Sequence, residues 1–81
     1  MELEIITPDR SVFKGEATSV ILPGGDGSLG ILDNHAPLIT TLKSGELKVI
    51  DDKGKETVFE LKGGGVAEVQ KNKLIILAES I

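Results

Sequence analysis

The chain has 81 residues, a formal net charge of −4 at pH 7 and no cysteine. This length predicts a single small domain spanning residues 1–81. The acidic balance argues against nucleic-acid binding, which needs a basic surface, and the lack of cysteine excludes disulfides and thiolate metal sites. A secreted chain this short usually needs disulfides, so the composition favours an intracellular protein.

Alternating apolar and polar residues predict strands rather than helices along the whole chain. Ten glycines and three prolines interrupt the windows in which an amphipathic helix could form. Near the N-terminus, Leu3 and Ile5 fall on one face and Glu4 on the other. Glu2 and Glu4 also interrupt the apolar start that a signal peptide would need. In chain order, strands are predicted at 2–6, 11–14, 17–22, 28–32, 38–42, 46–51, 56–62, 65–70 and 73–78.

Turn signals separate these segments about every 8–12 residues, a spacing typical of an antiparallel sandwich or barrel. They are rich in residues that tolerate positive φ or form local hydrogen bonds. The last strand contains Leu74–Leu77, which is apolar on both faces and predicts burial on both sides or cover by a partner. The sequence therefore predicts an all-β, two-sheet antiparallel β-sandwich. Its turns are expected at Lys43–Gly45, Asp51–Gly54, Gly63–Gly65 and Gln70–Lys73.

The segment Gly25–Gly30 matches the G-x-G-x-x-G pattern of dinucleotide-binding loops. Such a site requires a helix directly after the glycines, because the helix N-terminus binds the pyrophosphate. Here Asp33, Asn34 and Pro37 follow, which favour a loop, and Asp26 would repel phosphate. We therefore interpret the motif as a tight β-turn and expect no direct nucleotide binding.

His35 is the only histidine, so any general base or metal site would have to include it. Asp33 could orient its ring, and Ser28 or Ser44 could be considered as a nucleophile. However, there is no G-x-S-x-G turn, and a zinc site would need more His or Cys ligands. The prediction is a loop histidine that makes a polar or packing contact, with no catalytic residue, no metal site and no cofactor.

The loop residues carry a specific resemblance. Val20–Leu32 followed by Asn34–Thr40 contains the string G-x-L-G-I-L-x-x-H-A-P-L-I-T, and this resembles the epsilon subunit of the F-type rotary ATP synthase. The likeness extends over essentially the whole chain. The supporting segments, in the family's order, are Thr7-Pro8, Phe13–Gly15, Leu42–Gly45, Gly64–Val69 and Leu77-Ala78.

The resemblance implies a non-catalytic β-sandwich in the central stalk of a proton-translocating ATP synthase. In that family the domain packs beside the gamma subunit and rests on the ring of c subunits, so that proton flow stays coupled to ATP synthesis. This would place the protein peripherally, through the complex only, on the cytoplasmic side of the bacterial inner membrane. Longer members continue into a helical hairpin that inhibits hydrolysis or binds ATP. Those roles are not carried over to this chain, which resembles the short form.

The same resemblance implies two sets of contact residues. Asp26 and Asp33 would give the first set an acidic character that complements arginine-bearing loops of the c ring. Gly30 is expected where φ is positive or where a side chain would collide. In the second set, Leu38 and Leu42 fit the core equally well, and Thr7 fits a turn. The c-ring set is Asp26, Ser28, Gly30, Asp33, Asn34 and His35, and the gamma set is Thr7, Leu38, Ile39, Thr40 and Leu42.

A second class of function stays open on the residues alone. A free-standing β-sandwich could bind a protein or another ligand, such as a peptide or a glycan. Glycan sites usually offer exposed aromatic platforms, and two Phe with no Trp or Tyr argue against that. An enzyme ranks third, because no nucleophile–base pair is evident.

Overall fold

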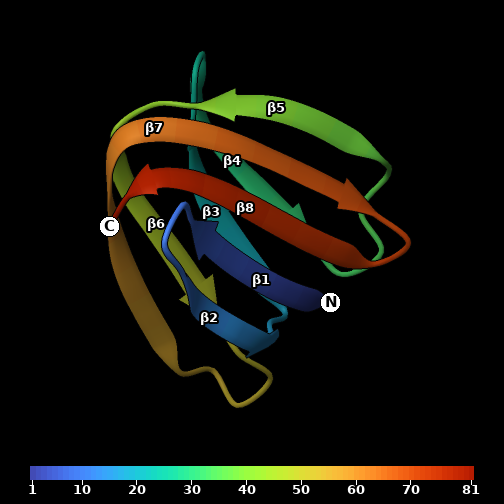
Figure 1. Cartoon of the computed structure of the whole chain (residues 1–81). Helices are drawn as coiled ribbons and strands as arrows, with labels where there is room; N and C mark the ends of the chain where they lie inside the picture. Colours follow the sequence, from blue (N-terminus) through green and yellow to red (C-terminus); the bar gives the residue numbers. More distant parts are fainter.

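The computed structural model describes residues 1–81 as eight strands joined by short turns (Figure 1). This confirms the all-β prediction, and most strand bounds agree within two residues. The strands are β1 (Glu2–Thr7), β2 (Arg10–Glu16), β3 (Ser19–Gly24), β4 (Gly27–Leu32), β5 (Leu38–Leu42), β6 (Gly45–Ile50), β7 (Glu56–Gln70) and β8 (Lys73–Ser80).

The strands form two layers that share β7. One layer has the order β2-β1-β8-β7-β5, and in the other β4 pairs with β3, β3 with β6, and β6 with the first part of β7. Figure 1 shows β5, β7, β8 and β1 side by side in front of β3, β4 and β6. A single bridge, Gly24 to Leu42, joins β3 to β5. The predicted antiparallel pairing holds except between β1 and β8, which run parallel.

The glycine run Gly63–Gly65 bends one strand, whereas the sequence predicted a turn between two. β7 is continuous over 15 residues, with an irregular register between Lys62 and Gly65. Gly63 and Gly64 have φ values of 90° and 85°, and a Cβ on Gly64 would lie 2.6 Å from the carbonyl oxygen of Leu42. The glycines therefore let β7 pass from one layer to the other while its neighbours approach closely.

Sixteen buried hydrophobic residues fill the space between the layers, with Phe13 and Phe59 packed against them. On β8 the burial alternates: Leu74 and Ile76 are fully buried, while Ile75 is half-buried and Leu77 is 50% exposed. The prediction that β8 is buried on both sides is therefore wrong at Leu77, and the alternative, cover by a partner, stays a prediction. Each fully buried aliphatic side chain stabilises the fold by about 1.5–3 kcal/mol.

Candidate functional site

The residues predicted to meet the c ring lie along an edge strand and its two flanking turns, which we call the β4 edge (Asp26–His35). Asp26 is in the turn between β3 and β4, whereas Asp33 follows the far end of β4. At about 3.3 Å per residue, the strand separates them by roughly 20 Å. The set is therefore not one loop: Ser28 and Gly30 lie on β4, which the sequence predicted as a strand at 28–32, and the other four residues lie in the turns at its two ends.

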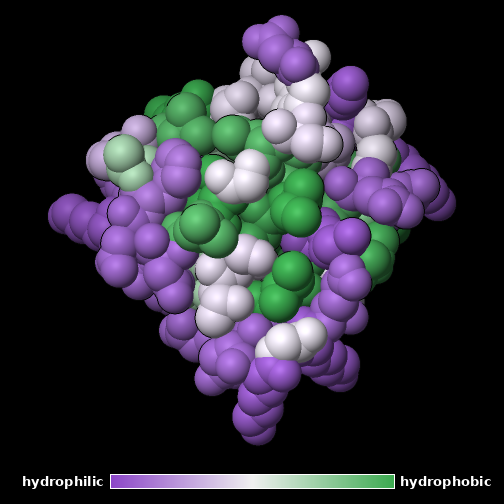
Figure 2. Space-filling view, turned by 180° about the vertical axis from the view of Figure 1, so that it is seen from behind, coloured by the Kyte–Doolittle hydropathy of each residue, from purple (hydrophilic) through white to green (hydrophobic).

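Alternation along β4 selects which side chains face outward. Ser28, Gly30 and Leu32 are exposed, while Leu29 and Ile31 turn toward the core. Leu32 is 63% exposed and was missed by the sequence interpretation, although the period of two from Ser28 would have found it. Ile21 on β3 pairs with Gly30 and is also exposed. Figure 2 shows this side of the molecule from behind, with apolar side chains near its centre and hydrophilic ones around them.

Gly30 does not have the conformation expected from the sequence. Its φ lies outside the left-handed region, and a Cβ built on it would meet no atom within 4 Å. The expectation of strain or collision is therefore wrong. Instead, the missing side chain leaves bare backbone next to Ile21 and between the outward side chains of Ser28 and Leu32.

The loop between β4 and β5 (Asp33–Pro37, the β4–β5 loop) is organised by local hydrogen bonds. The His35 N–H donates to the carbonyl of Leu32 at 3.2 Å, and the ring Nδ1 lies 2.7 Å from the carbonyl oxygen of Ala36. Asn34 has a φ of 61°, and its N–H donates to Asn72 Oδ1 at 2.7 Å. His35 is thus a loop histidine that makes a polar contact, as predicted.

Asp33 does not contact His35. Its carboxylate contacts the amino group of Met1, which also donates to the carbonyl of Ala17 at 2.7 Å and lies 3.5 Å from Glu16. Burial alone would lower the pKa of this amino group, but the carboxylates of Asp33 and Glu16 raise it above its usual value. The acidic residue of the β4–β5 loop is therefore partly neutralised by a cation of the same chain.

The gamma set divides between the two faces of its layer. Leu42 is buried in the core and Leu38 packs against it, as the alternative interpretation of these residues allowed. Ile39, on the opposite face of β5, is 70% exposed. Thr7 is buried, and its hydroxyl donates to Asp9 Oδ1 at 3.1 Å and to the carbonyl of Arg10 at 3.3 Å, which stabilises the turn between β1 and β2.

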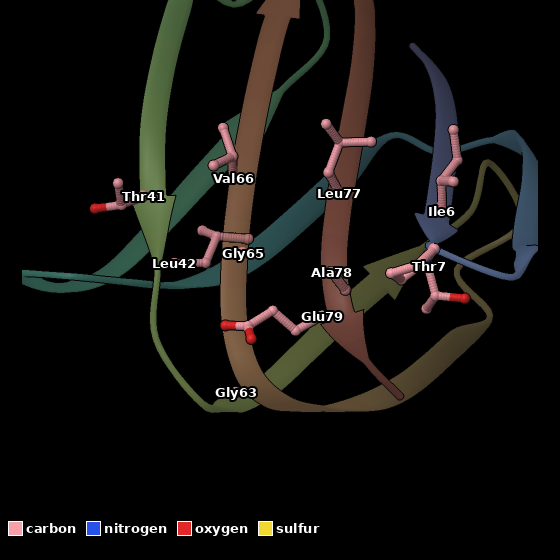
Figure 3. A pocket seen from close by; sticks show the side chains of 11 residues that line it. Ile6, Thr7, Thr41, Leu42, Gly63, Gly65, Val66, Leu77, Ala78 and Glu79 are labelled. Atoms are coloured by element: carbon pink, nitrogen blue, oxygen red, sulfur yellow. The ribbon is translucent and has the colours of Figure 1, made fainter.

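A groove of about 770 Å³ opens on the outer face of this layer, and Figure 3 shows it from close by. Its apolar walls come from Ile6, Val66 and Leu77, which are neighbours in the strand register. Thr7 and Leu42 of the gamma set contribute to it, whereas the three wall residues were missed, because cross-strand register cannot be deduced from the sequence. The groove is lined by Ile6, Thr7, Pro8, Thr41, Leu42, Gly63, Gly65, Val66, Leu77, Ala78 and Glu79.

One end of the groove carries a negative charge. In Figure 3 the Glu79 side chain points across the groove toward Gly63, and its Oε2 lies 3.4 Å from the position that a Gly63 Cβ would occupy. Glu79 forms no ion pair. The groove can therefore accept apolar side chains and, at this end, a cationic one.

No three His, Asp or Glu side chains come close enough together to hold a metal ion. The chain also contains no helix that could cross a membrane. The hydroxyl oxygen of Ser44 accepts a hydrogen bond from the Gly63 N–H at 3.0 Å and supports the bend in β7.

Sequence comparisons place the chain among known proteins. Residues 1–81 match the family model described as ATP synthase, Delta/Epsilon chain, beta-sandwich domain. The chain is 44% identical over 78 residues to the ATP synthase epsilon chain of Dichelobacter nodosus, covering 96% of this chain and 54% of that one. It is also 44% identical over 81 residues to the epsilon chain of Chlorobium limicola, covering 99% of this chain and 90% of that one. The chain thus spans about half the length of the first relative and most of the second.

Solved structures share the fold. A chain in the Euglena gracilis mitochondrial ATP synthase (OSCP/F1/c-ring) superposes with a TM-score of 0.89 at 24% identity, covering 96% of this chain and 49% of that one. A chain in the central stalk and c ring of the Tetrahymena thermophila mitochondrial ATP synthase gives 0.79 at 21% identity, covering 96% and 62%. These likenesses confirm the β-sandwich.

Proposed function

The chain belongs to the β-sandwich family of ATP synthase delta and epsilon chains, and we propose that it acts as a non-catalytic central-stalk subunit of a proton-translocating F-type ATP synthase. The observation that carries the proposal is the family match over the whole of residues 1–81. In this role the 81 residues act as one domain that links the gamma subunit to the c ring. The domain keeps proton flow coupled to ATP synthesis without contributing a catalytic residue.

The β4 edge is the proposed contact with the c ring. Its outward face offers Ser28, bare backbone at Gly30 and exposed Leu32 along one strand. An exposed carboxylate lies beyond each end, Asp26 at one and Asp33 at the other. Polar loops bearing arginine would pair with these carboxylates at the rim, while the strand face gives apolar and backbone contact.

The groove is the proposed contact with the gamma subunit. Ile39 and Leu77 expose apolar surface on the same outer face, and burying such surface yields about 25 cal/mol per Å². A standard interface takes about 800 Å² from each partner. That is roughly a sixth of the 4680 Å² of accessible surface on this chain, so two partners can bind on different layers at once.

The proposed location follows from these partners. The chain would lie at the cytoplasmic side of the bacterial inner membrane, attached peripherally through the c ring and the gamma subunit. Its net charge of −4 is compatible with this arrangement, since protein partners rather than anionic lipid would hold it at the surface.

Co-purification with gamma, together with ATP-driven proton pumping in reconstituted membranes, tests the proposal. Leu77→Glu places a charge in the groove and should weaken gamma binding at least tenfold. Val58→Glu is the matched control, because Val58 is 49% exposed on the other layer. Normal gamma binding by Leu77→Glu would show that the groove is not the interface.

A free-standing binding module is the second candidate, and the groove is the observation that favours it. A volume of about 770 Å³ with apolar walls could also take a short peptide segment. If the chain co-purifies with neither gamma nor the c ring, and proton pumping is the same with and without it, this second function replaces the first.

A further inference from the structure

One side chain of the turn between β7 and β8 forms a long-range hydrogen bond to the β4–β5 loop. Asn72 Oδ1 accepts the N–H of Asn34 at 2.7 Å, across a sequence separation of 38 residues. The backbone carbonyl of the same Asn72 accepts the N–H of Glu2 at 3.1 Å. Asn72 thus bridges β1 and the β4–β5 loop, and it was absent from both predicted sets of contact residues.

The backbone of this turn does not by itself require an asparagine. Lys71 and Asn72 have φ values of 51° and 56°, so both central residues of the turn are left-handed. Glycine, asparagine and aspartate all accept this conformation, and a lysine occupies it next door. What distinguishes Asn72 from Lys71 is the side-chain oxygen that reaches Asn34.

The loop forms few other hydrogen bonds or ion pairs with the rest of the sandwich. Asn34 is itself left-handed and exposed, and both hydrogen bonds of His35 go to residues at or next to the loop, Leu32 and Ala36. The remaining long-range contact joins Asp33 to the Met1 amino group. Loss of the Asn72 acceptor would therefore release the centre of the loop, where Asn34 and His35 lie.

We propose that Asn72 is a positioning residue, which holds Asn34 and His35 in the shape in which the β4–β5 loop binds the c ring. This inference rests on the proposed function, since it assigns a binding role to the loop. Asn72 acts through Asn34 and need not touch the ring. The proposal explains why the turn carries a side-chain acceptor at this position in addition to left-handed backbone.

Three variants of the full chain separate the side-chain oxygen from the backbone conformation. Asn72→Gly keeps the left-handed turn and removes the acceptor. Asn72→Asp keeps the left-handed turn and the side-chain acceptor. Lys71→Gly is the control, because it changes the neighbouring left-handed residue, whose side chain makes no hydrogen bond to the loop. Hydrogen exchange at the Asn34 amide, measured by NMR, should be about 2- to 10-fold faster in Asn72→Gly alone. Equal exchange in Asn72→Gly and the unchanged chain would overturn the proposal.

A second measurement tests the binding role in the assembled complex. Retention of the chain on reconstituted c ring and gamma is compared for the three variants and for His35→Ala. Asn72→Gly should weaken ring retention by about 2- to 10-fold, Asn72→Asp should restore it, and gamma binding should stay unchanged. If His35→Ala weakens ring retention but Asn72→Gly does not, the inference about Asn72 is wrong and the proposed contact stands. If neither does, the ring contact of this loop is wrong as well.

Discussion

Gly30 in β4 and Gly64 in β7 lie in similar glycine-rich stretches, yet the structure uses them in opposite ways. A Cβ on Gly30 would meet nothing within 4 Å, whereas one on Gly64 would lie 2.6 Å from the Leu42 carbonyl oxygen. β4 is an edge strand that pairs only with β3, while β7 has neighbours on both sides. The need for glycine is therefore set by the backbone conformation and the neighbouring strands at each position, and not by the glycine-rich sequence around it.

The largest effect of this difference is expected at Gly64. Gly64→Ala forces a side chain into left-handed backbone, with φ at 85°, and against the backbone of β5, which cannot yield as a flexible side chain would. We expect a loss of about 2–4 kcal/mol in the free energy of unfolding. Urea unfolding followed by far-UV circular dichroism measures it. A loss under about 1 kcal/mol would mean that the bend in β7 can relax.

Gly54 separates the two effects that act together at Gly64, which are the left-handed backbone conformation and the close contact with Leu42. It is left-handed, with φ at 81°, but a Cβ there would meet nothing within 4 Å. Gly54→Ala should therefore cost about 1–2 kcal/mol, from backbone conformation alone. Gly54→Asn is the control, because asparagine tolerates this conformation and should restore most of the stability. Equal losses for Gly54→Ala and Gly64→Ala would show that the contact with Leu42 adds nothing.

Local chemistry made several features predictable. The turn at Asp51–Gly54 was expected from its Asx residues, and Asp51 Oδ1 accepts the N–H groups of Lys55 and Lys53 at 2.9 Å each. The hydrogen bonds from Lys55 and then Lys53 lower the pKa of the Asp51 carboxyl. Alternation likewise predicted the buried positions of β1, because a side-chain period of two depends only on the strand itself.

Features that depend on which strands become neighbours could not be predicted. The parallel pairing of β1 with β8, the bend at Gly63–Gly65 and the groove walls all arise from contacts between distant segments. The role of Asn72 belongs to the same class, since its partner Asn34 is 38 residues away. On the β4 edge, the sequence indicated Ser28 and His35 and predicted the strand at 28–32, but it did not show that Ile21 of β3 lies beside Gly30.

The smallest effect on stability is expected at Gly30, which has neither a left-handed backbone conformation nor a close neighbour. The backbone is extended and the Cβ position is open, so Gly30→Ala should leave the free energy of unfolding unchanged or raise it by up to about 1 kcal/mol, because the unfolded chain loses freedom. Gly30→Val should fold equally well, since a branched side chain suits an exposed strand. A loss above about 1 kcal/mol in either variant would reveal strain at Gly30.

Because these variants keep the fold, they test the proposed ring contact directly. A valine side chain at position 30 would lie beside Ile21 on the exposed face and cover the backbone that glycine leaves accessible. Retention on the c ring should then fall more for Gly30→Val than for Gly30→Ala, with gamma binding unchanged. Equal retention of both variants and the unchanged chain would mean that the outward face of β4 does not meet the ring, and that only its flanking turns can.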